Sequence, residues 1–340
     1  MNLLSAGENV GVHSELGWVA RLVARAVGVP ESTMDEASSI VDGETTVAVR
    51  IESDGAAFDT TGMRPVTRGA HSDGRRTVLR DVGGSGFDLM LTADERLDVT
   101  VRYRPGYQVR AANALLSSRF ALLAGQVLVH YPVLWRAGWR GRVPLHASVV
   151  ATPAGTALLA GPGGVGKSTV LARALAQGGT ATADNLCAAD ETTCYGLSEP
   201  LRTDAAGAAG HRTSHGRVES ALPGRVPALA PDRIVVLERG PRTEITAIEP
   251  ARAARALVAG TYAGGELRRY WSFAATMALA TGRGPAHPPV AAVAAAYAQR
   301  LPCARVVVGD GDTLTAEQLC ATGVPAPAGD PRSREQRKAR

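Results

Sequence analysis

Residues 161–169 read GPGGVGKST, and this stretch governs the interpretation of the whole chain. It matches the pattern G-x-x-x-x-G-K-[ST], whose fixed positions are Gly161, Gly166, Lys167 and Ser168. The lysine is unusual here, because the chain has 37 basic residues and all are arginine except Lys167 and Lys338. A compact ammonium is not interchangeable with a planar guanidinium. We therefore infer that Lys167 is retained for its chemistry.

The segments on either side of this stretch have the order that a phosphate-binding loop requires. Residues 156–160 (TALLA) predict a short buried strand, and residues 168–177 (STVLARALAQ) predict a helix that ends at two glycines. Backbone N–H groups of such a loop point at phosphates, its lysine reaches the β- and γ-phosphates, and its serine binds Mg²⁺. The alternative is a chance match in a glycine-rich chain. The predicted nucleotide-binding residues are Gly161, Pro162, Gly163, Gly164, Val165, Gly166, Lys167, Ser168 and Thr169.

Composition and charge narrow the class of protein. At 340 residues, with 45% hydrophobic and 20% charged residues, the chain is typical of a globular protein with two domains. Most of the net charge of +5 comes from the basic tail after residue 329, so the charge does not predict nucleic-acid binding. No apolar run has the length of a membrane span, and the start lacks a signal-peptide pattern. The four cysteines form no C-x-x-C pair, so we expect buried free thiols and a cytoplasmic protein.

The pattern along the chain predicts three parts. Residues 1–140 predict a smaller α+β domain, with helices over 14–27 and 110–130 and several strands; it is assigned either a packing role or recruitment of a substrate or partner. Residues 141–322 predict the nucleotide-binding core, in which 144–151, 180–186 and 234–238 are strands. Residues 200–231 have the composition of a long mobile loop, and residues 323–340 predict a disordered tail.

Polar residues on both sides of the loop add to the pattern. His146 lies in PLHASVV upstream, and Asp184 and Asn185 follow the next strand in TATADNL. With a separate N-terminal domain in front, this order resembles the HPr kinase/phosphorylase-like family of serine kinases. The resemblance is strongest over residues 144–186 and weaker in PDRIVVLERG, ITAIEPARAARALV and LPCARVVVG. It implies an α/β fold with a P-loop kinase core like that of phosphoenolpyruvate carboxykinase, preceded by the α+β domain.

The resemblance also implies roles for individual residues. Asp184 matches the first acid of the family's pair and is implied to bind Mg²⁺ together with Ser168; its alternative is a strand-end cap. The second acid, implied to accept the proton of the serine hydroxyl, falls at Asn185, and an amide cannot take up that proton. His146 is the other candidate base, with a core histidine as the alternative. Independently of the resemblance, Glu238 at the end of the predicted strand 234–238 is either a second metal-binding carboxylate or a surface charge.

The sequence therefore predicts an ATP- and Mg²⁺-dependent kinase that phosphorylates a serine-type hydroxyl. The predicted catalytic residues are His146, Lys167, Asp184 and Asn185. The acceptor is a protein, a peptide or a small hydroxy compound, as in peptide or natural-product tailoring. HPr itself is disfavoured as the acceptor, because this chain has no clear match to the downstream signature segment of true HPr kinases. No nucleic-acid or membrane partner is expected, and a homo-oligomer stays open. The rival hypothesis, favoured by Asn185, is a nucleotide-binding accessory protein with impaired catalysis.

Overall fold

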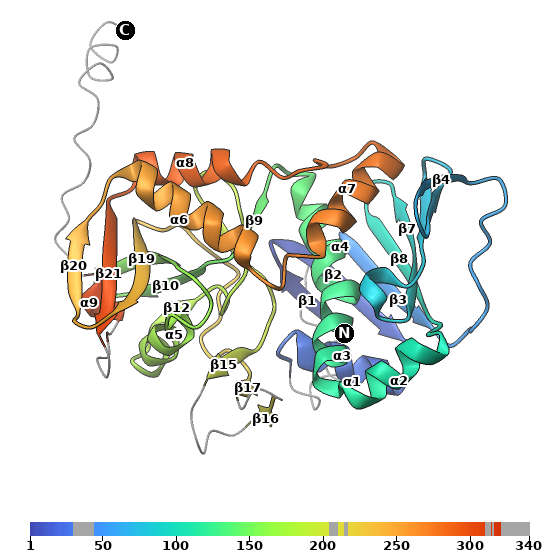
Figure 1. The fold of residues 1–340 in the computed structure, drawn as a ribbon, viewed down its shortest axis with the longest axis horizontal. Helices are drawn as coiled ribbons and strands as arrows, with labels where there is room; N and C mark the ends of the chain where they lie inside the picture. The colour runs from blue at the N-terminus through green and yellow to red at the C-terminus, as the bar shows by residue number, and fades with distance from the viewer. Residues whose placement is uncertain (30–43, 204–209, 214–216, 310–313, 315, 321–340) are drawn as a thin grey trace, which may run out of the picture.

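The computed structural model describes residues 1–29, 44–203, 210–213, 217–309, 314 and 316–320. Within them the chain folds as a mixed α/β protein with four sheets, as Figure 1 shows. The sheets have eight, six, four and three strands. The coarse prediction of an α/β protein is confirmed.

The first 103 residues build the eight-stranded sheet, in the order β1-β2-β3-β8-β7-β6-β5-β4. β3 is parallel to both β2 and β8, and the other pairs are antiparallel. Alternate residues such as Val47, Val49 and Ile51 are buried, which is the period of a strand with one face on a core. The strands are β1 (Asn2–Ser5), β2 (Glu8–Ser14), β3 (Val47–Glu52), β4 (Arg64–Thr67), β5 (Ala70–Ser72), β6 (Arg76–Leu79), β7 (Phe87–Ala93) and β8 (Leu97–Tyr103). A 3₁₀ turn, Val82–Gly84, precedes β7.

The first predicted helix is shorter at its start than expected. α1 spans Gly17–Ala26, because Ser14 is the last residue of β2 and its hydroxyl accepts the backbone N–H of Leu16 instead of capping the helix. Its predicted end is confirmed: Gly28 adopts a left-handed φ of 71°. That conformation is the usual glycine stop of a helix.

The predicted helix over 110–130 is wrong in its bounds and its continuity. It comprises α2 (Tyr107–Leu115), α3 (Ser117–Gly125), a π-helical turn (Gln126–His130) and α4 (Tyr131–Gly138). Leu116 has non-helical φ and ψ, which turns α2 away from α3. From the π turn onward the residues are buried through Gly138, so packing on the sheet extends the helix further than periodicity alone predicts.

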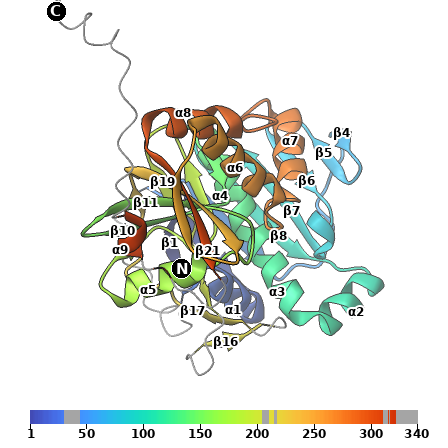
Figure 2. The ribbon, with the colours of Figure 1, turned by 60° about the vertical axis from the view of Figure 1, so that its left-hand side comes forward.

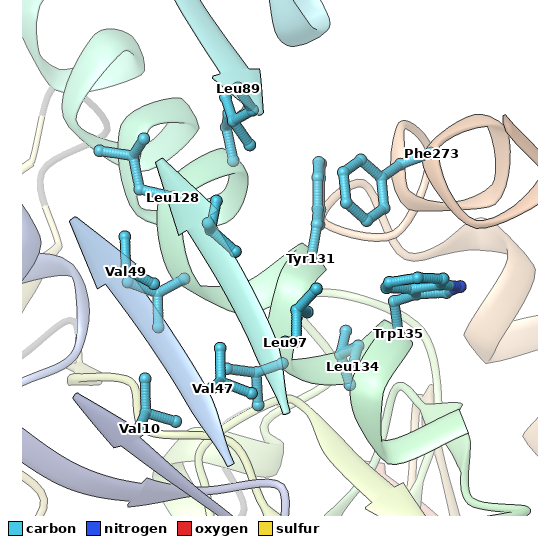
Figure 3. Close-up of a cluster of buried hydrophobic side chains, with 14 of the residues drawn as sticks. Val10, Val47, Val49, Leu89, Leu97, Leu128, Tyr131, Leu134, Trp135 and Phe273 are labelled. Atoms are coloured by element: carbon cyan, nitrogen blue, oxygen red, sulfur yellow. The ribbon is translucent and has the colours of Figure 1, made fainter. Parts of the chain in front are cut away.

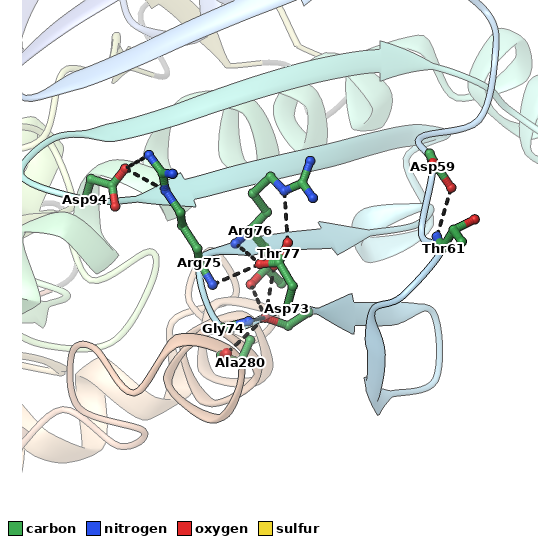
Figure 4. A network of polar contacts seen from close by, with 10 residues as sticks. Asp59, Thr61, Asp73, Gly74, Arg75, Arg76, Thr77, Asp94 and Ala280 are labelled. Carbon is green, nitrogen blue, oxygen red and sulfur yellow. Dashed lines mark hydrogen bonds and ion pairs between the residues drawn. The ribbon is translucent and has the colours of Figure 1, made fainter.

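A helix from late in the chain completes this first core. α7 (Tyr270–Thr281) packs beside α4 over the eight-stranded sheet, and Figure 3 shows Phe273 of α7 facing Tyr131 and Trp135 of α4. Figure 4 shows the polar turn at Asp73 beside the end of α7, where the Ser72 hydroxyl donates to the carbonyl of Ala280 at 3.0 Å. These contacts join α7 to elements that precede the predicted domain boundary at residue 140. The division into two domains stays a prediction.

The six-stranded sheet has helices on both faces. Its order is β12-β10-β11-β19-β21-β20, and β11, β19 and β21 run parallel. Leu158 and Ala160 of β11 face α6 and α8, whereas Ala157 and Leu159 face α5 and α9. Figure 2 shows the two pairs of helices on opposite sides of the sheet. Burial on both faces explains the continuous apolar runs of these strands.

The elements of this part are β10 (Ser148–Thr152), β11 (Gly155–Ala160), β12 (Thr180–Ala181), β19 (Arg233–Gly240), β20 (Glu244–Ala247), β21 (Cys303–Gly309), α5 (Lys167–Ala176), α6 (Pro250–Ala263), α8 (Val290–Arg300) and α9 (Ala316–Cys320). The strand and helix predicted on either side of residues 161–166 are thus observed as β11 and α5.

Neither of the two strands predicted before and after the loop and α5 is continuous as predicted. The strand predicted over 144–151 is β9 (Val143–Leu145) in the four-stranded sheet and then β10 in the six-stranded sheet. The strand predicted over 180–186 is wrong in its end: only β12, its first two residues, is strand, residues 182–186 form a turn, and β13 (Cys187–Ala189) of the four-stranded sheet begins after the predicted range. β14 (Cys194–Gly196) and β18 (Ala228–Leu229) complete that sheet. The chain changes sheets at His146 and again at Asp184, so both side chains leave the regular ladders at the same border.

The predicted loop over 200–231 contains short strands where it is described. β15 (Leu201–Thr203), β16 (His211–Arg212) and β17 (Val218–Ser220) form the three-stranded sheet. The remaining parts of that prediction, 204–209 and 214–216, and the predicted tail 323–340 lie outside the described residues.

Two further expectations bear on the class of protein. All four cysteines are free and buried, as predicted. Among the described residues, no single helix is long and apolar enough to cross a membrane; α2 and the helical run 117–138 meet that test only as a pair bent by 108°.

Candidate functional site

Three glycines shape the loop between β11 and α5. Gly161, Gly164 and Gly166 have φ values of 147°, 79° and 112°, a region that side chains with a Cβ rarely adopt. A Cβ on Gly161 would also lie 2.7 Å from the carbonyl oxygen of Leu237. Val165 is buried and anchors the loop in the core beneath α5. The loop therefore requires glycine at these positions, and it leads directly into the N-terminus of α5.

Lys167 is the first residue of α5, and its side chain is buried. Its Nζ donates to the carbonyls of Gly161, at 2.7 Å, and Pro162, at 3.1 Å. Burial lowers the pKa of Lys167 to about 8, while the charges of Asp184 and Glu266 act in the opposite direction. At neutral pH the ammonium is thus charged, held within the loop and shielded from water.

Asp184 is fully buried beside this lysine. Its Oδ2 accepts the backbone N–H of Arg202, at 3.2 Å, and the side-chain amide of Asn185, at 3.1 Å. Its Oδ1 is buried and has no hydrogen-bond partner in the part of the chain that the structure describes. Burial raises the pKa of Asp184, and a hydrogen bond from the Ser168 side chain, together with the contacts of Arg202 and the charge of Lys167, acts against that shift. A buried carboxylate oxygen without a partner is rare and fits a site for a cation.

Asn185 bridges Asp184 to a buried acid that the sequence did not reveal. The backbone N–H groups of Asn185 and Leu186 donate to Oε1 of Glu199, at 2.6 and 2.9 Å. Glu199 also pairs with Arg202 at 3.8 Å, and burial raises the pKa of its carboxyl to about 7. Glu199 lies behind the turn at Asn185 and holds it in place. A lone glutamate in GLSEP carries no pattern that predicts this position.

His146 lies across the site, at the switch from β9 to β10. Its backbone N–H donates to Thr261 Oγ1 at 3.1 Å, and its Nδ1 lies 3.2 Å from the carbonyl oxygen of Gly260. A carbonyl only accepts, so Nδ1 carries the hydrogen and Nε2 of the neutral ring has a free lone pair. Burial and the charge of Lys167 lower the pKa of His146, which keeps the ring neutral. The backbone contacts agree with a packed histidine, and the free Nε2 agrees with a base.

These residues surround a cavity of about 180 Å³, here called the phosphate cavity. Of the predicted site residues, the lining includes His146, Gly163, Gly164, Gly166, Lys167, Ser168, Thr169 and Asn185. The other four predicted site residues do not line the cavity: Gly161, Pro162, Val165 and Asp184. Four charged residues that sequence reasoning missed also line it: Arg202, Arg217, Arg239 and Glu266. They come from four separate segments, and no motif links them.

Glu238, a candidate for a second metal-binding carboxylate, is instead a surface charge. It forms ion pairs with Arg305 at 2.7 Å and Arg252 at 3.5 Å, is partly exposed, and does not line the phosphate cavity. Within the described ranges, no three His, Cys, Asp or Glu side chains gather as a metal site. The donor set beside the loop is therefore one hydroxyl and one carboxylate, a set suited to Mg²⁺ shared with phosphate oxygens and water.

A scan of the chain against protein-family models and a comparison with curated proteins both find no match. The resemblance to HPr kinase-like proteins therefore depends on the quoted residues alone and stays a prediction.

Proposed function

We propose that this protein binds ATP with Mg²⁺ at the phosphate cavity and transfers the γ-phosphoryl group to a hydroxyl. The observation that carries the proposal is the buried ammonium of Lys167 at the start of α5, enclosed by a loop in which three glycines adopt a backbone conformation that other residues rarely reach. Backbone N–H groups at a helix start favour phosphate, and the lysine adds a charge-assisted donor. This geometry supports a P-loop kinase core, the finer form of the predicted fold.

The cation site is the second support. Ser168 and Asp184 would hold Mg²⁺, with Asp184 Oδ1 as the carboxylate oxygen that lacks a hydrogen-bond partner in the described structure. When bound, Mg²⁺ supplies neutralisation of charge on the β- and γ-phosphates. Arg202, Arg217 and Arg239 add positive charge around the same cavity. Charge neutralisation and positioning supply most of the rate of phosphoryl transfer.

The transfer step assigns a role to His146. The acceptor oxygen forms a bond to the γ-phosphorus while the bond from that phosphorus to the β,γ-bridging oxygen breaks. The electron pair of the broken bond leaves with ADP, and the hydroxyl proton moves to Nε2 of His146. The neutral tautomer set by Gly260 leaves that nitrogen free to accept the proton. His146 thereby replaces the acid for which this chain has Asn185.

The second candidate function is an accessory protein that binds ATP to hold a conformation or a partner. The observation that favours it is Asn185, whose amide donates to Asp184 at 3.1 Å where the resemblance implies a base. The two functions differ in a single respect, turnover in the presence of an acceptor.

The decisive experiment measures Mg²⁺-dependent ATP binding and turnover by the purified protein and by Lys167→Ala. We expect turnover to fall about 10²–10³-fold in the variant, the usual cost of removing a charge-stabilising donor. Lys338→Ala, which alters the other lysine of the chain, is the matched control and should behave as wild type. Failure of the wild type to bind ATP would overturn both candidate functions. Binding without turnover, when acceptors are supplied, would favour the accessory protein.

A further inference from the structure

A second, larger cavity of about 650 Å³ adjoins the phosphate cavity. It lies between α1 and α3 on one side and the three-stranded sheet on the other, elements that are neighbours in Figure 1. Arg202, Arg217 and Glu266 line both cavities. The volume falls within the range that holds a small-molecule ligand. A molecule in this second cavity would therefore extend to the border at which phosphate is bound.

The charges around the second cavity are unequal. Four arginines line it, against the two glutamates Glu219 and Glu266. The Glu219 carboxylate is shared by two of these arginines: Arg25 lies 3.1 Å from Oε2 and Arg202 lies 3.2 Å from Oε1. Arg119 on α3 is exposed and pairs with no carboxylate of the described residues. The excess of guanidinium groups favours a ligand with a carboxylate, phosphate or similar anionic group.

The helical wall of the cavity is apolar. Ala26 of α1 and Ala121 and Leu122 of α3 line this side. Leu122 is a large apolar side chain that remains 40% exposed beside the cavity. Covering such a surface with a hydrocarbon group is favourable, because it removes apolar area from water. One side of the cavity thus fits an apolar body, and the arginines fit an anion.

We propose that this second cavity holds the phosphate acceptor, and that the acceptor is a small hydroxy compound that carries both an apolar body and an anionic group. The inference rests on the proposed kinase function and specifies its substrate class. The hydroxyl lies at the border marked by Glu266, facing the γ-phosphate and His146. Its oxygen takes the phosphoryl group and its proton goes to His146, so the products are ADP and a phosphate monoester of the anionic acceptor.

Binding of defined probes tests the cavity without nucleotide. N-octanoyl-L-serine has the hydroxyl, the carboxylate and the apolar chain, N-octanoyl-L-serinamide lacks the anion, and N-acetyl-L-serine lacks the apolar body. By isothermal titration calorimetry, we expect N-octanoyl-L-serine to bind at least about tenfold more tightly than either of the others. The serinamide loses a charge-assisted contact with arginine, and N-acetyl-L-serine loses the burial of an alkyl chain. Equal affinity for all three probes, or no saturable binding of N-octanoyl-L-serine, would overturn the proposal.

Variants on α3 and matched controls on the adjoining α2 locate the site. Arg119→Gln should weaken N-octanoyl-L-serine by about tenfold and leave the serinamide unchanged, since only the charge contact is lost. Leu122→Ala should weaken both octanoyl probes by about threefold. The controls are Arg110→Gln and Leu115→Ala, exposed residues of α2 that do not line the cavity. If a control variant has the same effect as its counterpart, the probe binds elsewhere and the proposal fails.

Phosphoryl transfer to the probe separates this inference from the proposed function. With Mg²⁺ and ATP, ³¹P NMR should detect the phosphate monoester of N-octanoyl-L-serine. Product formation with the expected probe preferences supports both proposals. Turnover of ATP with another acceptor, and no cavity-dependent binding of the probe, overturns the substrate class alone. Cavity-dependent binding without any ATP binding overturns the kinase and, with it, the role of the cavity as an acceptor site.

Discussion

Asp88 of the eight-stranded sheet and Asp184 beside the phosphate cavity are both buried, but the contacts of the two carboxylates differ. In the sheet, Asp88 is buried but accepts from Arg104 at 2.7 Å and from the backbone N–H of Asp81 at 2.8 Å. Around the cavity, by contrast, Asp184 keeps an oxygen without a partner in the described structure, and burial shifts the pKa of Lys167 and Glu199 toward neutrality.

This difference has a physical meaning. Charged groups that are buried and incompletely paired cost stability, and the cost is recovered when a ligand of opposite charge arrives. The sheet region is therefore expected to supply stability, and the cavity region is expected to supply binding and chemistry. Each of the following predictions tests one side of that contrast.

The largest effect on chemistry is expected from His146→Ala. Loss of the base should lower turnover about 10²–10⁴-fold while ATP affinity changes little, because His146 acts on the acceptor proton. Steady-state kinetics and ATP titration measure the two quantities. His13→Ala, an exposed histidine of β2, is the control. Equal losses of turnover and affinity, or a misfolded variant, would assign His146 to packing and weaken the contrast.

The largest effect on stability is expected from Phe87→Ala in the sheet region. Phe87 is fully buried among Trp18, Tyr103 and Phe120, so its removal should lower the free energy of unfolding by about 3–5 kcal/mol. Urea denaturation measures the change. The exposed Tyr107→Ala is the control. A loss below about 1 kcal/mol would show that this core is not the main source of stability, contrary to the comparison.

The pH dependence of stability should reveal the buried Glu199. Its folded-state pKa of about 7 exceeds its ordinary value of 4.5, so the native state holds this proton more tightly than the unfolded chain does. The contribution is complete below pH 4.5 and is lost as the pH rises through about 7. As the pH rises through that window, wild type loses this contribution and Glu199→Gln does not. The free energy of unfolding of the variant should therefore rise relative to that of wild type by up to about 3 kcal/mol.

Denaturant titrations at several pH values, without nucleotide and Mg²⁺, measure this difference. Comparing the two proteins at each pH cancels the titration of other buried groups, among them His130, whose pKa burial lowers to about 4. A stability difference that stays constant with pH would mean that Glu199 is charged throughout and well paired, as in the sheet region.

The smallest effect is expected from Asn185→Asp, which adds a second carboxylate beside Asp184. The amide donor to Asp184 Oδ2 is lost and two like charges come together, which should weaken ATP turnover by about tenfold. Steady-state assays at varied Mg²⁺ measure it. A higher rate would instead show that a missing acid limits the reaction, and it would restore to position 185 the role implied by the resemblance.

The two regions also differed in how well the sequence predicted them. The alternation of apolar and polar residues over 97–103 predicts a strand, and β8 spans the same residues, because that alternation is a local signal. Around the cavity, β9, β12 and β15 are only two or three residues long, and the chain passes from one sheet to another between short strands. The run over 144–151 therefore looked like one strand, although it is divided at His146. Long-range pairing, which a local pattern does not encode, determines where such segments end.

By itself, the sequence determined the strand, loop and helix from β11 to α5. The glycines are required by backbone conformation, Lys167 and Ser168 occupy fixed positions beside them, and all of these constraints are local. Only the tertiary structure decided which side chains complete the site. Arg202, Arg239 and Glu266 come from separate segments that the packing of the chain brings to one cavity, and Glu199 lies behind the turn at Asn185. The orphaned oxygen of Asp184 and the depressed pKa of Lys167 follow from burial, which is a property of the folded chain alone.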